Sequence, residues 1–387
     1  MDNEPGRLLS ETPLRPRLAF IVTEDWFFAS HFLPMARAAL EAGFEPVVIT
    51  RVRRHRAVIE AAGARVIPLE AERGSINPLL AGGAVMRLAA LLRRERVTAV
   101  HCIALRSIIV GGLAARLSGV RWRLFALTGG GMLAARTDRS SRTVYQSIRW
   151  SIRHVLETRR THYLFENRDD PVTLGLDPKA PNVTIVGGAG VDVARFPALA
   201  LPPVSPLRIA VVSRMLWSKG IDLVVEAVSA ARAQGAPVEL SLFGESDPSN
   251  PRAISRDTLR EWSAREGIFW HGFSSDVAAV WADHHVACLV SRGGEGLPRT
   301  LLEAAACARP ILTSDVPGCR DFVRNGVDGF VVPPNDVAAL TSRILELAEM
   351  GLPKLQAMGE SARSCVEDGY TESNVREAVG EVYRRWL

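Results

Sequence analysis

Residues 208–226, RIAVVSRMLWSKGIDLVVE, contain the pattern that decides the fold of this chain. The apolar run 209–212 predicts a buried parallel strand, and the apolar spacing from residue 221 onward predicts a helix directly after it. A short polar loop that carries Arg214 and Lys219 joins the two. In open α/β sheets, ligands bind outside the carboxyl ends of the strands, where such loops lie. The stretch therefore predicts a Rossmann-like unit with two cations at its ligand-binding edge.

A second stretch, GGEGLPRTLLE at 293–303, is a Gly-rich turn that leads into an apolar helix. Glu295 lies in the turn just before the helix, and Glu303 lies inside the helix, about 12 Å further along the helix axis. That distance is comparable to the reach from the hexose of a nucleotide sugar to its ribose. Pro298 suits a first helical turn, and Gly296 lets backbone amides approach a ligand. We therefore expect Glu295 to bind sugar hydroxyls, Glu303 to bind ribose hydroxyls, and the exposed N–H groups to face a diphosphate.

Arg214 and Lys219 supply positive charge where a departing diphosphate would gain negative charge. The sequence contains no Asp-x-Asp motif that would offer a metal partner for the phosphates. We therefore expect cationic side chains to replace a metal ion, and we expect no cofactor.

Strand and helix patterns alternate on both sides of a proline-rich segment, PALALPPVSPL at 197–207. This alternation predicts an α/β protein with two doubly wound, Rossmann-like domains facing a central cleft, the architecture called GT-B. The expected divisions are a flexible tail at 1–16, an N-terminal domain at 17–196 that binds the acceptor, the linker at 197–207, a C-terminal domain at 208–371 that binds the nucleotide sugar, and a last helix at 372–387 that packs back on the N-terminal domain.

Composition limits the cellular setting. The chain has 387 residues, 47% of them hydrophobic, which is enough for two cores. Its five cysteines lack C-x-x-C spacing, which is typical of a reducing compartment. The first residues lack the apolar centre of a signal peptide, and no run approaches the roughly 18 apolar residues of a membrane span. We expect a cytoplasmic protein, peripheral on the inner face of the membrane.

The charge is uneven along the chain. Residues 1–200 hold 28 Lys or Arg against 18 Asp or Glu, whereas the rest hold 19 against 24. A basic half favours an anionic partner; without zinc-finger or RNA-recognition spacing, we expect an anionic membrane surface and no nucleic acid. The segment 136–160 has seven Arg, with apolar residues at helical spacing. It fits a basic amphipathic helix on lipid, or a helix packed on the core with a solvated Arg face.

Several motifs of the second half resemble the family 4 retaining glycosyltransferases of GT-B fold. They are SRMLWSKGIDLVVEAV, FGES at 243–246, WHGF at 270–273 and the stretch 291–336. The resemblance implies that Arg214 and Lys219 hold the donor diphosphate, Glu295 the hexose and Glu303 the ribose. It also implies that the FGES and HGF loops border the nucleobase. The implied donor site thus adds Phe243, Gly244, Phe273, Gly296 and Leu297.

The first half is similar to a narrower group, the enzymes that extend lipid-diphosphate-linked sugars on the cytoplasmic membrane face. The motifs are at 23–43, 101–120, 127–131, 166–170 and 187–192. Many family 4 members have a Gly-Gly pair after the first strand, where this chain has Asp25-Trp26-Phe27-Phe28. We therefore expect this loop to serve the acceptor, with Trp26, His31 and Gly130 as its binding residues.

His101 completes the expected catalytic set of Glu295, Arg214, Lys219 and His101. We expect His101 to end a strand and to point toward the cleft. By analogy with the family, its ring would lie near the reactive face of the sugar and bond a hydroxyl; the alternative is a core histidine with its hydrogen bonds satisfied.

The resemblance implies a retaining, metal-independent transfer of a hexose or N-acetylhexosamine from a nucleotide-diphosphate sugar. UDP is the expected nucleotide, and the acceptor is a lipid-linked saccharide in cell-surface glycan synthesis. A family 4 transferase with a soluble acceptor and a nucleotide-sugar epimerase remain as alternatives.

Overall fold

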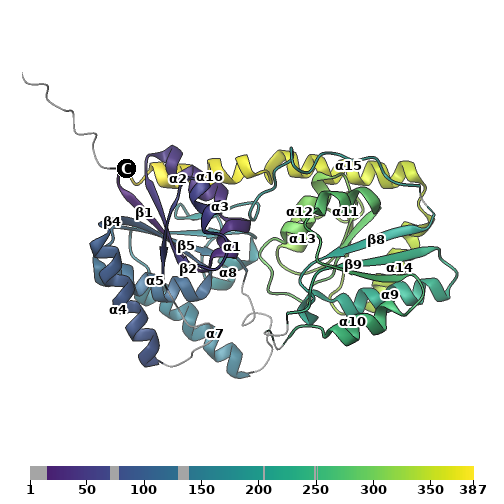
Figure 1. Ribbon diagram of the computed structural model, residues 1–387, viewed down its shortest axis with the longest axis horizontal. Coiled ribbons are helices and arrows are strands. Elements are labelled where there is room, and N and C mark those ends of the chain that lie inside the picture. The colour runs from purple at the N-terminus through teal and green to yellow at the C-terminus, as the bar shows by residue number, and fades with distance from the viewer. Residues whose placement is uncertain (1–14, 70–77, 130–138, 204, 248–249, 251) are drawn as a thin grey trace, which may run out of the picture.

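The computed structural model describes residues 15–387 apart from 70–77, 130–138, 204, 248–249 and 251. Most of the expected tail at 1–16 lies outside the described residues. Two α/β domains lie side by side along the long axis, and the last two helices run along one edge of both (Figure 1). The predicted fold class is confirmed.

The N-terminal domain is built on a parallel sheet of seven strands in the order β3-β2-β1-β4-β5-β6-β7. Helices cover both faces: one apolar cluster includes residues of α1 and α2, and another includes residues of α4 and α5. The strands are β1 (Arg17–Glu24), β2 (Glu45–Arg51), β3 (Arg65–Pro68), β4 (Val97–Ile103), β5 (Trp122–Leu127), β6 (Thr161–Phe165) and β7 (Val183–Ile185). The helices are α1 (Asp25–His31), α2 (Leu33–Ala42), α3 (Arg56–Ala61), α4 (Pro78–Arg94), α5 (Ala104–Ser118), α7 (Arg139–Ser151) with a π-helical turn at Ile152–Leu156, and α8 (Asp169–Leu174).

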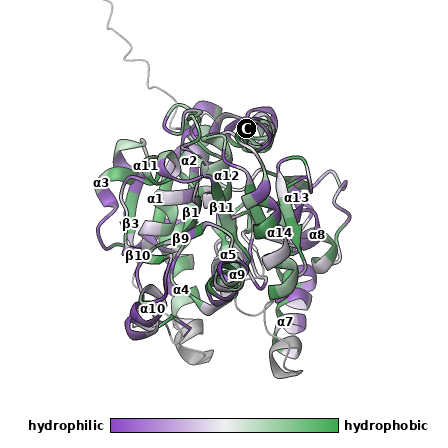
Figure 2. Ribbon diagram, turned by 90° about the vertical axis from the view of Figure 1, so that its right-hand side faces the viewer, coloured by the Kyte–Doolittle hydropathy of each residue, from purple (hydrophilic) through white to green (hydrophobic). Residues whose placement is uncertain are grey.

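The C-terminal domain repeats this plan with six parallel strands in the order β10-β9-β8-β11-β12-β13. Hydrophobic strands fill its centre (Figure 2). The strands are β8 (Leu207–Val212), β9 (Val238–Phe243), β10 (Ile268–Gly272), β11 (Val286–Leu289), β12 (Ile311–Ser314) and β13 (Gly329–Val332). The helices are α9 (Ile221–Ala233), α10 (Arg256–Ser263), α11 (Val277–Asp283), α12 (Arg299–Ala306), α13 (Cys319–Phe322), α14 (Val337–Glu349) and α15 (Leu352–Gly369).

The strand order reverses once in each sheet, between β1 and β4 and between β8 and β11. Such a switch point opens a crevice at the carboxyl ends of the strands, because the following helices lie on opposite faces. The loop after β8 carries Arg214 and Lys219, the loop after β11 carries Glu295, and Glu303 follows in α12.

The segment after β1 is helical, so that Asp25 begins α1. Its buried carboxylate accepts the backbone N–H groups of Arg53, Arg54 and His55 at 2.6, 2.9 and 2.9 Å. Burial raises the pKa of Asp25, but these hydrogen bonds outweigh it and hold the pKa below its ordinary value. Asp25 thus anchors the basic loop after β2 to α1.

The last helix, α16 (Glu372–Arg384), belongs physically to the N-terminal domain although it ends the chain. Thr371 caps it with a capping box, and Val375, Val379, Val382 and Tyr383 join the N-terminal core. Trp386 stacks on Trp122 with ring centroids 5.8 Å apart. The chain therefore crosses between the domains twice.

The basic segment 136–160 forms α7 and the π-helical turn, while residues 136–138 lie outside the described part. Ile148, Ile152 and Val155 pack into the N-terminal core, in keeping with the second alternative given above. Trp150 and Val144 remain 59% and 48% exposed. Within the described residues, no helix has the length and apolar character needed to cross a bilayer.

Replacing Tyr383 by Phe tests the attachment of α16. The Tyr383 hydroxyl lies 2.7 Å from His101 Nδ1 in a fully buried site. Without the hydroxyl, the imidazole nitrogen loses its partner where water cannot replace it, so the free energy of unfolding should fall by about 1–3 kcal/mol. Urea unfolding measures the difference. Y145F, whose hydroxyl makes no hydrogen bond to other described residues, is the control and should cost far less; equal losses would contradict the assignment.

Candidate functional site

The site centres on an ion pair between Lys219 and Glu295. Lys219 Nζ lies 2.7 and 2.9 Å from the two carboxylate oxygens, and Ser291 donates a hydrogen bond of 2.8 Å to one of them. Both charged side chains are largely buried. Burial raises the pKa of Glu295, but Lys219, Ser291 and the charge of Arg214 together hold it below its ordinary value. Glu295 is therefore an ionised carboxylate at neutral pH.

Gly220 allows this pair to form. It follows Lys219 in the left-handed conformation, with φ of 68°, and a Cβ there would lie 2.1 Å from the Val290 carbonyl oxygen. Only glycine lets the loop after β8 pass so close to the end of β11. The structure thus joins two motifs that are 76 residues apart in the sequence.

Arg214 lies exposed at the end of β8, near enough for its charge to act on Glu295. Glu303 is paired within α12: Arg299 Nε donates to its carboxylate at 2.8 Å. Burial raises the pKa of Glu303 against the opposing effect of Arg299. Arg299 also donates to the Ser30 carbonyl oxygen of α1. Arg299 is therefore a third cation at the cleft. It was not expected from the sequence, although its i,i+4 spacing to Glu303 was a signal.

The loops expected at the nucleobase lie next to one another after β9 and β10. The Phe243 ring stacks on His271 with centroids 4.6 Å apart, and the Gly244 N–H donates to the Gly272 carbonyl at 2.7 Å. A Cβ on Gly244 would lie 1.9 Å from the Ser213 carbonyl oxygen, which also ties this loop to β8. Phe273 is 72% exposed, so its ring is free to stack on a flat ligand.

On the opposite side of the cleft, His31 ends α1. Its Nδ1 lies 2.6 Å from Ser30 Oγ, and its ring lies 4.8 Å from that of Phe27. Burial lowers the pKa of His31 to about 4, and the charges of Arg299, Arg214 and Lys219 add to this effect. His31 is therefore neutral, and it faces the cations of the other domain.

The remaining predicted acceptor residues are placed differently. Trp26 is half-buried with its ring against Phe27. Gly130 lies outside the described residues. Its neighbour Gly129 contacts the Gly-rich turn that carries Glu295, because a Cβ there would lie 2.5 Å from the Glu295 backbone.

The prediction for His101 is wrong in its geometry. The residue lies inside β4 rather than at its end, and its ring is fully buried. The ring packs against Phe20 and Phe32 and bonds Tyr383, while its Nε2 has no partner among the described residues. Burial lowers its pKa to about 3. His101 does not point toward the cleft in this structure, because α16, which ends the chain, covers it.

Glu166, at the end of β6, was not expected in the site. It accepts the backbone N–H of Leu297 at 3.0 Å, across the domain boundary. A Cβ on Gly296 would lie 1.9 Å from its carboxylate. Burial, together with the charges of Asp170 and Glu295, raises the pKa of Glu166 to about 8 against the opposing Leu297 hydrogen bond. One amide expected to face a diphosphate therefore already contacts a carboxyl group.

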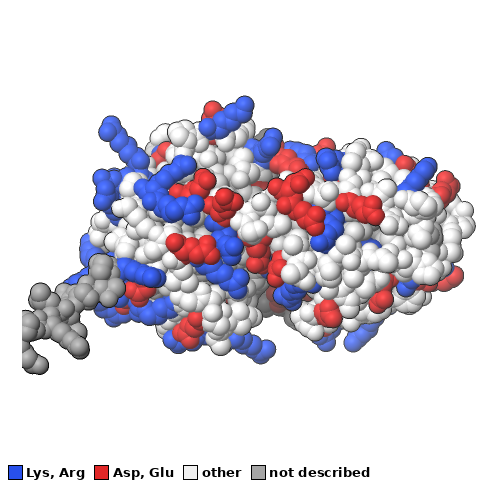
Figure 3. Space-filling view, turned by 90° about the horizontal axis from the view of Figure 1, so that it is seen from above, with Lys and Arg blue, Asp and Glu red and all other residues white. Residues whose placement is uncertain are grey.

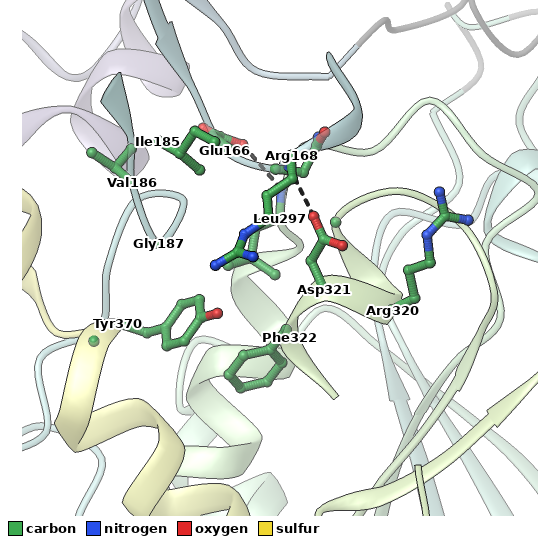
Figure 4. Close-up of a pocket in the computed structure, with 13 residues that line it drawn as sticks. Glu166, Arg168, Ile185, Val186, Gly187, Leu297, Arg320, Asp321, Phe322 and Tyr370 are labelled. Carbon is green, nitrogen blue, oxygen red and sulfur yellow. Dashed lines mark hydrogen bonds between the residues drawn. The ribbon is translucent and has the colours of Figure 1, made fainter. Parts of the chain in front are cut away.

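A cavity of about 600 Å³ lies beside this contact, between the two domains. Figure 4 shows Glu166, Arg168, Leu297, Asp321 and Tyr370 around it. Among the residues that the structure describes, no three His, Cys, Asp or Glu side chains are placed to hold a metal ion.

Two family models match the chain. Residues 17–157 match the family described as Glycosyl transferase 4-like, and residues 206–350 match Glycosyl transferases group 1. The two matches fall on separate domains, as the fold divides them.

Curated relatives are similar at low identity. A putative colanic acid biosynthesis glycosyltransferase, WcaL of Salmonella typhimurium, is 28% identical over 52% of this chain and 51% of its own length. The match thus spans about half the length of that relative. An N,N'-diacetylbacillosaminyl-diphospho-undecaprenol alpha-1,3-N-acetylgalactosaminyltransferase of Campylobacter jejuni is 22% identical over 92% of this chain and 95% of its own.

Solved structures share the fold. A glycosyltransferase from Rickettsia africae has a TM-score of 0.74 at 16% identity, covering 96% of this chain and 99% of its own. Anabaena HepE, in complex with UDP and glucose, has a TM-score of 0.71 at 14% identity, covering 95% and 98%. With both domains matched to family models and the fold shared across the whole chain, this protein belongs to the family 4 glycosyltransferases of GT-B fold.

Proposed function

We propose that the protein transfers a hexose or N-acetylhexosamine from a UDP-sugar to a lipid-linked saccharide in cell-surface glycan synthesis. Transfer proceeds with retention of configuration and without a metal ion. The observation that carries this proposal is the Lys219–Glu295 pair, with Arg214 beside it, at the switch point of the C-terminal sheet. The pair combines a group that stabilises a leaving diphosphate with a group that accepts hydrogen bonds from sugar hydroxyls.

Three cations support a diphosphate donor. Arg214, Lys219 and Arg299 all act on the His31 ring, so their charges converge on one region of the cleft. The bond from the sugar to the diphosphate breaks as negative charge develops on phosphate oxygen, and fixed cations stabilise that charge without reorganisation. Anabaena HepE, which shares the fold, was crystallised with UDP and glucose.

Attack from the same face as the departing diphosphate gives retention. The acceptor oxygen bonds to the sugar carbon, and its proton passes to the released phosphate oxygen. Ionised Glu295 holds the sugar through its hydroxyls, and neutral His31 can accept a hydrogen bond from the acceptor hydroxyl.

The acceptor assignment rests on the relatives and on charge. The Campylobacter relative, which matches nearly the whole chain, is named for a diphospho-undecaprenol substrate, and WcaL is named for colanic acid synthesis. Arg53 and Arg54 are exposed on the loop that Asp25 ties to α1. Basic side chains are dense over the N-terminal domain on the face in Figure 3. Such a surface suits an anionic membrane on the cytoplasmic side.

Loss of either cation should slow transfer. Lys219→Ala removes the partner of Glu295 and one stabiliser of the leaving group, so kcat should fall by about 100- to 1,000-fold, and Arg214→Ala should behave similarly. Turnover at saturating donor measures the effect, with Lys354→Ala on α15 as the control. EDTA or added Mg²⁺ should change little. Near-normal turnover in both variants would rule out this site.

Glu295 and Glu303 should separate in function. Glu303→Gln should weaken binding of free UDP, because ribose hydroxyls belong to substrate and product alike. Glu295→Gln should leave UDP affinity almost intact but abolish transfer, because its partner is the sugar. Calorimetric titration with UDP, beside a transfer assay, tests this division. Equal weakening of UDP binding by the two substitutions contradicts it.

Arg53→Gln with Arg54→Gln should weaken binding to anionic vesicles. Each Arg near such a surface contributes about 1 kcal/mol, which salt screens. The fold should persist, because Asp25 holds the backbone of these residues and not their side chains. Co-sedimentation at low and high salt measures the change, with Arg260→Gln and Arg265→Gln on the C-terminal domain as the charge-matched control. Wild-type protein that never sediments would favour a soluble acceptor.

A further inference from the structure

Glu166 and the turn at residues 295–297 make a direct contact between the two domains. The carboxyl group follows β6 of the N-terminal domain, and the Leu297 N–H belongs to the Gly-rich turn of the C-terminal domain. Gly296 leaves no space for a side chain there, since a Cβ would lie 1.9 Å from Glu166 Oε2. The carboxyl group is thus pressed against the turn that carries Glu295.

The surroundings of Glu166 are mixed in charge. The neighbouring Asp170 accepts a hydrogen bond of 3.0 Å from the Asn167 side chain, and burial is the main cause that raises its pKa to about 6.

Two further pairs lie nearby. Asp321 accepts the backbone N–H of Arg168 at 2.8 Å, and Arg320 pairs with Asp169 at 2.8 Å. Besides Asp170 and Glu295, the charged or titratable groups that face Glu166 or share its cavity are Arg168, Arg320, Asp321 and Tyr370.

A carboxylate on this amide resembles a bound anion. The turn around residues 295–297 is where we place the donor diphosphate, so this step rests on the proposed function. Ionised Glu166 would hold the Leu297 amide through a charge-assisted hydrogen bond and would place a second negative charge near Glu295. A diphosphate that enters must overcome both effects. Neutral Glu166 holds the amide more weakly and adds no charge.

We propose that Glu166 is an internal anion that competes with the donor diphosphate for the turn at 295–297, so that its ionisation weakens donor binding. Glu166 acts as a positioning residue, through the Leu297 amide. The cavity beside it gives the carboxyl group a route to water and room to move away when donor binds.

The sign of the pH effect follows from linkage. The pKa of Glu166, about 8, lies between the two pH values compared below, and a nearby diphosphate raises it further. Donor binding then takes up a proton, so affinity should fall as pH rises above that value. His31 stays neutral across this range because its pKa is lowered to about 4.

The test compares the wild type with Glu166→Gln, which keeps an oxygen acceptor for the Leu297 N–H but cannot ionise. UDP is the probe, because its terminal phosphate, with a second pKa of about 6, changes little above neutral pH. The Kd of the wild type for UDP should rise roughly three- to tenfold between about pH 7 and about pH 9. The Kd of the variant should stay flat and be lower than that of the wild type at alkaline pH.

Asp321→Asn is the matched control. It changes another carboxylate that bridges the domains, through Arg168, and its side chain makes no hydrogen bond to the turn at 295–297 among the described residues. This control should keep the pH slope of the wild type. If it loses the slope while Glu166→Gln retains it, the proposal is overturned.

A second measurement needs no ligand. A glutamate whose pKa is raised by folding costs stability as pH rises from its unfolded value of about 4.3 to its folded value. The stability of the wild type relative to Glu166→Gln, from urea unfolding, should therefore fall up to about pH 8 and then level off. If UDP fails to bind at any pH, the proposed donor site is wrong, while this measurement still reports on Glu166. Parallel pH curves for the two proteins in both experiments would overturn the proposal.

Discussion

The ion pair between Lys219 and Glu295 is the interaction on which the rest of the site depends. Two charges removed from water cost much desolvation free energy, and their attraction offsets that cost only when the geometry is good and the remaining lone pairs are bonded. Here both carboxylate oxygens contact Lys219 Nζ, and Ser291 satisfies one of them further. The pair keeps an ionised carboxylate and a cation next to each other in the cleft.

Close backbone contact between the domains surrounds this pair. Gly129 abuts the Glu295 backbone and Gly296 abuts Glu166, both across the domain boundary. Within the C-terminal domain, a Cβ on Gly318 would overlap the Gly296 carbonyl oxygen. Glycines at these positions let the turn at 295–297 contact both domains at once. Any movement of one domain against the other must therefore disturb the turn that carries Glu295.

The two domains differ in charge, and the end of the chain returns to the first of them. The N-terminal domain carries most of the excess Arg and a loop fixed by Asp25, whereas the C-terminal domain carries the paired carboxylates. The return of α16 to the first domain buries His101 beneath Tyr383. That histidine is a core residue of the first domain, and the imidazole that faces the cations is His31.

The sequence by itself determined the local elements and the two motifs that carry Lys219 and Glu295. Apolar runs and strand–helix alternation depend on neighbours in the chain, so the α/β class, the two domains and the places of Arg214, Lys219, Glu295 and Glu303 could be predicted. Only the tertiary structure decided which groups meet: Lys219 with Glu295, Glu166 with Leu297, and Tyr383 with His101. These contacts join segments 76, 131 and 282 residues apart. Burial at these contacts raises the pKa of Glu166 and lowers that of His101, whereas Lys219 and its neighbours lower the pKa of Glu295. No pattern of adjacent residues encodes these contacts.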